Sequence, residues 1–117
     1  MHEFALADEI ARIVERKARE ADLVRVSELI LTLGALACVD RDALVFALEA
    51  ALRGGVANGA RIGIEALAAR ARCSACGLEQ GIAERFDPCS RCGAFGLEVL
   101  AGTELRLRSL EGLGREE

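Results

Sequence analysis

Tryptophan and tyrosine are absent from this sequence, and its only aromatic residues are four phenylalanines: Phe4, Phe46, Phe86 and Phe95. Proteins that bind single-stranded nucleic acid stack the bases on aromatic side chains, and the sequence offers no such platform. A surplus of positive charge is also lacking, since the formal net charge is −4. Without a basic field there is little to attract a phosphate backbone, so we expect no nucleic-acid partner.

Long apolar runs are missing as well. Apolar segments such as residues 29–33, which include Thr32, and residues 43–48 are far shorter than the roughly 20 residues needed to cross a bilayer. The start, Met1-His2-Glu3, does not resemble a secretory leader. We therefore expect no membrane association and a cytoplasmic location. The only histidine, His2, has no evident Ser or Cys partner for nucleophilic catalysis, and we expect no enzymatic activity.

The 117 residues contain 52% hydrophobic residues, enough for one small packed domain. Apolar residues that recur every three to four positions predict helices over 4–21 and from Asp40 or Asp42 to about 52. Alternation of apolar and polar residues predicts strands over 24–33, 61–71 and 97–110, the last with a bend at Gly102. The polar residues 111–117 are expected to form a frayed tail. The expected fold class is α+β: a small sheet of about three strands flanked by two helices, with an inserted four-cysteine module. We expect residues 1–72 and 96–117 to form one domain and residues 73–95 the module.

The strongest local signal is a pair of C-x-x-C-G motifs. Cys73 and Cys76 precede Gly77, and after twelve intervening residues Cys89 and Cys92 precede Gly93. Two residues between cysteines let both sulfurs face one ion about 2.3 Å away, and a following Gly permits the tight turn with positive φ. The sequence therefore predicts a closed, structural Zn(II) site with the ligands Cys73, Cys76, Cys89 and Cys92.

The module has few apolar residues between its cysteine pairs, namely Leu78, Ile82 and Phe86, so we expect it to fold only around metal. Iron held by the same four thiolates stays open as an alternative, and so do redox-active dithiols. Two disulfides are disfavoured by an odd total of five cysteines in a reducing compartment. A further alternative is a zinc ribbon that binds another protein or nucleic acid, although only Arg85 and Arg91 are basic between Cys73 and Cys92.

The first residues form a second candidate metal site. The Met1 α-amine, the His2 backbone nitrogen once deprotonated, and the His2 imidazole can close two adjoining chelate rings on one ion. A planar set of nitrogen donors suits Ni(II) or Cu(II) and suits zinc poorly. A fourth donor is needed from Glu3, from the next backbone nitrogen, from another carboxylate or from a partner. An exposed and incomplete site of this kind favours transfer of the ion over storage.

Three features together resemble the HypA/HybF nickel metallochaperones, which assist maturation of nickel–iron hydrogenases and, in some organisms, of urease. They are Met1-His2-Glu3 opening an amphipathic helix, Leu33-Gly34-Ala35-Leu36 followed by Val39-Asp40, and the paired C-x-x-C motifs. The resemblance covers nearly the whole chain. It implies a carrier that binds Ni(II) as cargo through Met1, His2 and Glu3, with Asp40 as a further candidate, and that holds a structural Zn(II).

The same resemblance implies as partners a HypB-type GTPase and the hydrogenase large subunit. A homodimer or strand-exchanged dimer stays open.

Two positions in the sequence bear on the resemblance to the nickel metallochaperones. Ala35 stands where many relatives carry Glu, so no carboxylate from that position can help to hold nickel. Cys38 is an additional thiol, which we expect to be a small buried hydrophobe, with a soft auxiliary metal ligand as the alternative.

Overall fold

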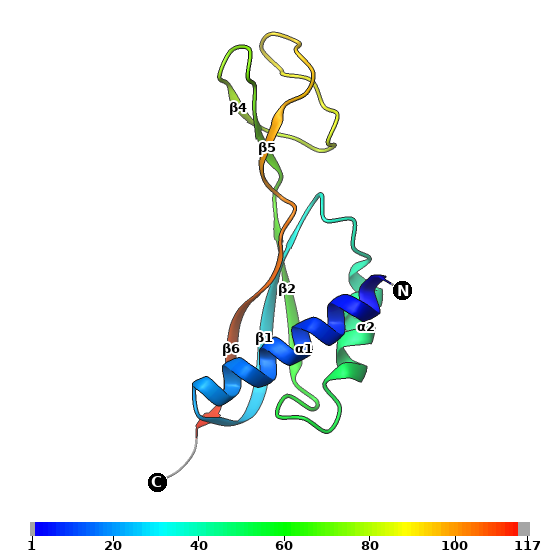
Figure 1. The fold of residues 1–117 in the computed structure, drawn as a ribbon, viewed down its shortest axis with the longest axis vertical. Helices are drawn as coiled ribbons and strands as arrows, with labels where there is room; N and C mark the ends of the chain where they lie inside the picture. The colour runs from blue at the N-terminus through cyan, green and yellow to red at the C-terminus, as the bar shows by residue number, and fades with distance from the viewer. Residues whose placement is uncertain (1, 115–117) are drawn as a thin grey trace. The chain divides into compact units, whose positions relative to one another are not determined.

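A computed structural model describes residues 2–114 of the chain. It has two helices and six strands, which form two three-stranded sheets with the strand orders β2-β1-β6 and β4-β3-β5 (Figure 1). The elements are α1 (His2–Glu20), β1 (Leu23–Gly34), α2 (Arg41–Ala51), β2 (Arg61–Leu67), β3 (Arg70–Arg72), β4 (Glu79–Gly81), β5 (Glu98–Ala101) and β6 (Leu105–Gly114). The α+β prediction of two helices with a small three-stranded sheet is confirmed. The second sheet was not predicted.

The described residues divide into two compact units. Residues 2–31, 39–64 and 106–114 form one, here called the helical unit, and residues 32–38 and 65–105 form the other, the cysteine unit. The predicted assignment of 1–72 with 96–117 to one domain and 73–95 to a module stays a prediction. In the structure, segments on both sides of the module pack together with it.

The helical unit is built on the apolar stripe of α1. Its core residues from α1, β1 and α2 include Ile10, Val14, Ala18, Val26, Leu29, Leu31, Leu44 and Leu48, each 5% exposed or less. Along β1 the buried side chains are Val26, Leu29, Leu31 and Thr32. The alternation expected for this strand therefore shifts between Val26 and Leu29 and breaks again at Thr32.

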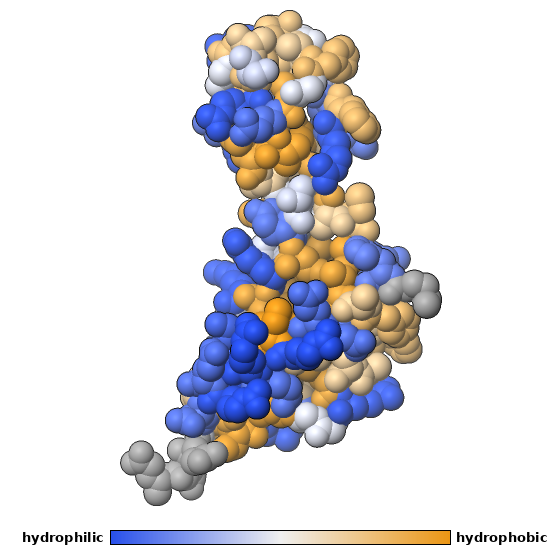
Figure 2. Space-filling view, viewed as in Figure 1, coloured by the Kyte–Doolittle hydropathy of each residue, from blue (hydrophilic) through white to orange (hydrophobic). Residues whose placement is uncertain are grey.

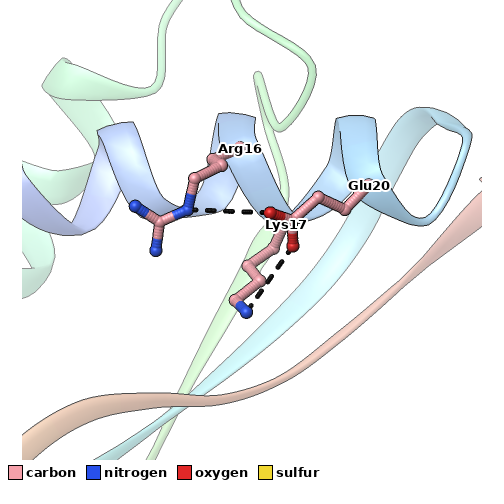
Figure 3. Close-up of polar contacts among 3 residues, drawn as sticks. All are labelled: Arg16, Lys17 and Glu20. Atoms are coloured by element: carbon pink, nitrogen blue, oxygen red, sulfur yellow. Dashed lines mark ion pairs between the residues drawn. The ribbon is translucent and has the colours of Figure 1, made fainter.

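The solvent side of α1 is polar in its second half. Near the end of the helix, Arg16 and Lys17 both form ion pairs with Glu20, at 4.0 and 3.6 Å (Figure 3). These three side chains are more than half exposed, so each pair contributes only a few tenths of a kcal/mol. Burial of the opposite face is therefore what fixes α1.

Two of the predicted strands are wrong in extent. The strand expected over 61–71 ends at Leu67, and the chain re-enters a different sheet at Arg70. The segment expected over 97–110 is divided into β5 and β6 at the predicted bend, where Gly102 has a φ of 112°. The two breaks contact each other: a Cβ on Gly102 would lie 2.6 Å from the Ala69 Cα. This close backbone approach explains why glycine stands there.

The cysteine unit has a small core of its own. Its buried residues are Leu36, Ala69, Ala71, Cys73, Ile82, Cys89 and Leu97. Strand β3 pairs antiparallel with β4 and with β5, and the β3–β5 register shifts between Arg70 and Ala71. Ile82 and the partly buried Leu78 contribute to this core. Phe86 does not, because it is 84% exposed.

The end of the chain is more ordered than its polarity suggests. Residues 111–114, predicted to be frayed, extend β6, and the Ser27 hydroxyl donates to the Glu111 carbonyl at 3.2 Å. The last three predicted tail residues lie outside the described residues. Among the residues described, neither helix combines the length and the apolar character that a membrane span requires.

Candidate metal centres

The cysteine unit brings Cys73, Cys76, Cys89 and Cys92 into one cluster. Their four sulfur atoms all lie within 4.8 Å of one another. The Sγ atoms of Cys73 and Cys92 are 3.6 Å apart, and those of Cys76 and Cys89 are also 3.6 Å apart. Cys73 and Cys89 are buried, whereas Cys76 is half-buried and Cys92 is exposed. The cluster therefore sits at the edge of the core of the cysteine unit.

Each cysteine pair is held by the same tight turn. The Gly77 N–H donates to the Cys73 carbonyl at 2.8 Å, and the Gly93 N–H donates to the Cys89 carbonyl at 2.9 Å. Both glycines have positive φ, 80° and 76°, as predicted. Residues that have a Cβ atom do not adopt this backbone conformation easily, so the turn requires glycine. The turn directs both sulfurs of a cysteine pair to the same side.

Hydrogen bonds also tie the second turn to β4. The Gln80 Oε1 accepts from the Ser90 N–H at 2.9 Å, and the Gln80 Nε2 donates to the Pro88 carbonyl at 3.2 Å. These bonds fix the loop that carries Cys89 against the strand that follows Cys76. The sequence did not single out Gln80, because no local pattern shows which backbone groups a glutamine side chain reaches across eight to ten positions.

The surroundings of three of the thiols shift their pKa values. Backbone N–H groups of Cys92 and Arg91 point at the Cys89 sulfur and lower the pKa of Cys89 to about 6. The Arg91 N–H lies 3.4 Å from that sulfur. The Cys76 N–H lowers the pKa of Cys73 in the same manner. At Cys92 the Ala94 N–H has a lowering effect, but hydrogen bonding with the neighbouring thiols Cys73 and Cys89 outweighs it and raises the pKa of Cys92 to about 11.

This set of four sulfur donors fits a metal ion that is tetrahedrally coordinated by thiolates. Four sulfurs each about 2.3 Å from a central zinc ion would be about 3.8 Å apart, close to the two 3.6 Å distances in the cluster. Backbone N–H groups directed at the sulfurs stabilise thiolate charge. Because all four positions are occupied by protein sulfur, the arrangement has no place for substrate and is structural in kind.

The helical unit contains the second candidate centre. His2 is exposed in the first turn of α1, and Glu3 follows it. The Asp40 backbone N–H donates to the Glu3 Oε2 at 3.1 Å. This hydrogen bond lowers the pKa of Glu3. Of the residues predicted for this site, the structure thus brings Glu3 and Asp40 together, while Met1 lies outside the described residues.

Asp40 has a structural role in addition to any metal role. It is the N-cap of α2, with extended backbone angles, and its Oδ1 accepts from the Ala43 N–H at 2.9 Å. Of the two candidate starts of this helix, Asp40 and Asp42, the structure uses Asp40 as the cap. A chain of two hydrogen bonds therefore runs from the first turn of α1, through Asp40, into the first turn of α2.

Cys38 differs from its expected environment. It is exposed, its φ is 56°, and its thiol points to the Leu36 carbonyl at 3.6 Å. The interpretation of Cys38 as a small buried hydrophobe is wrong. Free cysteines are usually buried, but the turn after Leu36 leaves this side chain exposed.

Comparisons with known proteins agree with these features. A family model described as "Hydrogenase/urease nickel incorporation, metallochaperone, hypA" matches residues 1–112. Proteins named hydrogenase maturation factor HypA are similar to this chain: one from Azotobacter vinelandii is 40% identical over 111 residues, covering 95% of this chain and 98% of its own. One from Rhodopseudomonas palustris strain TIE-1 is 42% identical over 111 residues, with the same coverage. The solution structure of the Ni metallochaperone HypA from Helicobacter pylori has a similar fold, with a TM-score of 0.75 at 21% identity over 97% of this chain and 98% of that one.

Proposed function

The chain belongs to the HypA family of hydrogenase/urease nickel-incorporation metallochaperones, and on this premise we propose that it carries one Ni(II) at the start of α1. The proposed donors are the Met1 amine, the His2 backbone nitrogen and imidazole, and Glu3, with Asp40 as a further candidate. Amine, amide and imidazole nitrogens form a planar set that suits Ni(II) better than zinc.

One observation carries this proposal: the 3.1 Å hydrogen bond between the Asp40 N–H and the Glu3 carboxylate. It fixes the turn that contains His2 against the start of α2 and places two carboxylates at the same corner of the helical unit. Negative charge there attracts a dipositive ion. Since His2 is exposed, the ion stays accessible to a receiving protein.

For the cysteine unit we propose Cys73, Cys76, Cys89 and Cys92 as the ligands of one resident Zn(II). Zinc bound there would cross-link the two cysteine turns and would have a structural, not a catalytic, role. The protein contributes the glycine turns, the backbone N–H groups aimed at sulfur, and the Gln80 bridge, all of which orient the thiolates. The similar geometry of other thiolate sites keeps iron as an alternative ion.

The proposed activity is delivery, without catalysis. Nickel would be received from or passed with a HypB-type GTPase and delivered to the hydrogenase large subunit in the cytoplasm. The family description supports a role in nickel incorporation, and these specific partners are part of the proposal, as is a homodimeric or strand-exchanged form. Assignment of residues 73–95 as the zinc module and of the remainder as the nickel domain belongs to the same proposal.

The test compares untagged protein with His2→Ala and with a variant that carries one additional N-terminal residue. Calorimetric titration with Ni(II) should give one site in the untagged protein and none in either variant, because both changes remove or displace a nitrogen donor. Metal analysis should find one zinc in all three. Nickel binding that is unchanged in both variants would contradict the site, and the zinc ribbon would then be the better description of the protein.

A further inference from the structure

The first cysteine turn belongs to a β-hairpin. Strand β3 ends at Arg72, directly before Cys73, and β4 begins at Glu79. Arg72 and Glu79 are partners in the antiparallel register of the two strands. The Cys73 N–H adds a further backbone bond, to the Leu78 carbonyl at 2.9 Å. The turn that carries Cys73 and Cys76 therefore cannot move away from the sheet without breaking strand pairing.

The second cysteine turn has no such support. In the described chain no strand lies between Gly81 and Glu98, and of residues 83–96 only Cys89 has a buried side chain. Backbone bonds within this segment close the turn on itself, for example from the Cys89 N–H to the Ala94 carbonyl at 2.8 Å. Figure 2 shows mostly pale orange and white residues at the upper end of the cysteine unit, whereas deep orange residues lie farther down within it. Apolar packing therefore contributes little to holding this turn.

The side chain of Gln80 supplies the connection that strand pairing does not provide. Its Oε1 accepts from the Ser90 N–H at 2.9 Å and from the Ser90 hydroxyl at 3.3 Å, and its Nε2 donates to the Pro88 carbonyl at 3.2 Å. We call these three hydrogen bonds the Gln80 clamp. Contacts between thiols aside, they are the hydrogen bonds that join residues 83–96 to the rest of the described chain. One amide thus holds the residues on both sides of Cys89.

The Gln80 clamp acts on the metal ligands through the backbone. Ser90 lies between Cys89 and Arg91, and the Arg91 N–H points at the Cys89 sulfur at 3.4 Å. Holding the Ser90 N–H restricts the next peptide group as well, and with it the direction of the Arg91 N–H. The same turn ends in Cys92, whose side chain is the exposed member of the cluster. The second cysteine pair therefore combines the most accessible ligand with the weaker attachment.

We propose that Gln80 is a positioning residue of the zinc site and that its amide limits the rate at which zinc is released. The inference rests on the proposed function of the cysteine cluster. Release requires one cysteine pair to move away from the other. The second pair is the one that moves, because a single side chain attaches its turn, while the first turn is part of a paired sheet. Loss of hydrogen bonds that orient metal ligands commonly weakens metal binding by about 10- to 100-fold.

The pattern of the Gln80 clamp requires an amide. A carboxylate in its place can still accept from the Ser90 N–H, but it has no hydrogen to donate to the Pro88 carbonyl. A leucine side chain is of comparable size and can do neither. Gln80→Leu therefore removes the whole clamp, whereas Gln80→Glu keeps the half that acts on Ser90.

The test compares zinc-loaded, full-length wild-type protein with Gln80→Leu, Gln80→Glu and the matched control Glu79→Leu. Glu79 is exposed and precedes Gln80 in β4, so its side chain is on the opposite face of the strand. Zinc transfer to an excess of a chromophoric chelator measures the release rate. Hydrogen exchange followed by NMR measures protection of the Ser90 amide. The Gly77 amide, which donates to the Cys73 carbonyl in the first turn, is the internal reference.

We expect Gln80→Leu to release zinc about tenfold faster than wild type, or more. Exchange of its Ser90 amide should accelerate by a similar factor, with the Gly77 amide unchanged within about twofold. Gln80→Glu should keep most of the Ser90 protection, and Glu79→Leu should match wild type in both measurements.

Two results would overturn the role of Gln80. Equal acceleration at Ser90 and Gly77 would mean that the substitution destabilises the whole cysteine unit. An unchanged release rate in Gln80→Leu would mean that the second turn does not depend on the clamp. Wild-type protein that holds no zinc would instead contradict the proposed function of the cluster, and the inference would fail with it.

Discussion

The Glu3 carboxylate accepts a hydrogen bond from the backbone N–H of Asp40, a residue 37 positions away in the sequence. Asp40 in turn caps α2 through the Ala43 N–H. The two helix starts are thus connected through the backbone and the side chain of Asp40. This connection gives Glu3 a positioning role that does not depend on any bound ion.

The first prediction concerns Glu3 in metal-free protein. In Glu3→Ala the Asp40 amide loses its acceptor, so its hydrogen exchange, followed by NMR, should become at least severalfold faster. Glu3→Gln is the matched control, because its side-chain oxygen can accept the same bond. Equal exchange rates at Asp40 in wild type and Glu3→Ala would show that the bond does not persist in solution.

The same carboxyl predicts a pH effect. Its pKa is lowered from the usual 4.5 because the Asp40 N–H donates to the ionised form. A lowered carboxyl pKa stabilises the folded state above about pH 4.5, and this contribution disappears as the pH falls through the lower folded value. The difference between the urea midpoints of wild type and Glu3→Gln should therefore be constant from pH 5 to 7 and shrink below pH 4.5. A constant difference down to pH 3 would contradict it.

A further prediction separates the capping role of Asp40 from its charge. Asp40→Ala should lower stability by about 1 kcal/mol, as expected for loss of an N-cap. Asp40→Ser should retain most of that stability, since its hydroxyl can accept from the Ala43 N–H, but it has no carboxylate. Thermal unfolding of the nickel-free proteins measures the cap. Equal midpoints for Ala and wild type would show that Asp40 does not cap α2 in solution.

Zinc affinity should rise with pH, because the thiol protons must leave before the sulfurs bind zinc. Cys92, with a pKa of about 11, is protonated at pH 7, and zinc must displace that proton. Below about pH 6 Cys89 also takes up a proton. The apparent zinc affinity should rise at least about tenfold per pH unit from 6 to 8 and more steeply from 5 to 6. Competition with a chromophoric chelator measures it. Cys38→Ser, which removes an exposed thiol outside the cluster, should show the same profile.

The last prediction tests the contact between the two strand breaks. In Gly102→Ala a methyl group would lie 2.6 Å from the Ala69 Cα, at a φ of 112°. We expect a loss of about 3 kcal/mol or more from steric overlap and backbone strain. Gly96→Ala is the control: its φ is 78°, and nothing lies within 4 Å, so about 1 kcal/mol of backbone strain is expected. Equal thermal midpoints for the two variants would contradict the close approach.

The sequence predicted those parts of the structure that depend on residues close together in the chain. The stripe through Ile10 and Val14 predicted α1, and the two C-x-x-C-G motifs predicted both the turns with positive φ and the cluster of sulfurs. Local sequence limited the cap of α2 to Asp40 or Asp42, because an acidic residue before a helix has a local hydrogen-bonding partner, and the structure uses Asp40.

The features that were missed depend on contacts between distant residues. The end of β2 at Leu67 arises where residues 69 and 102 touch. The sequence predicted the bend at Gly102 but not the contact that residue 102 makes with residue 69. The bond between Glu3 and Asp40 is equally non-local. The exposure of Cys38 follows from a turn whose φ of 56° is unusual for a residue other than glycine.

The division of the chain into units has a consequence for biosynthesis. The helical unit is assembled from three separate stretches, and the last of them, residues 106–114, supplies the edge strand β6. A ribosome makes the whole cysteine unit before it makes that strand. The nascent protein therefore cannot complete the sheet of its first unit until the thiols have left the exit tunnel. Neither unit can be removed as a single continuous fragment by one truncation of the gene.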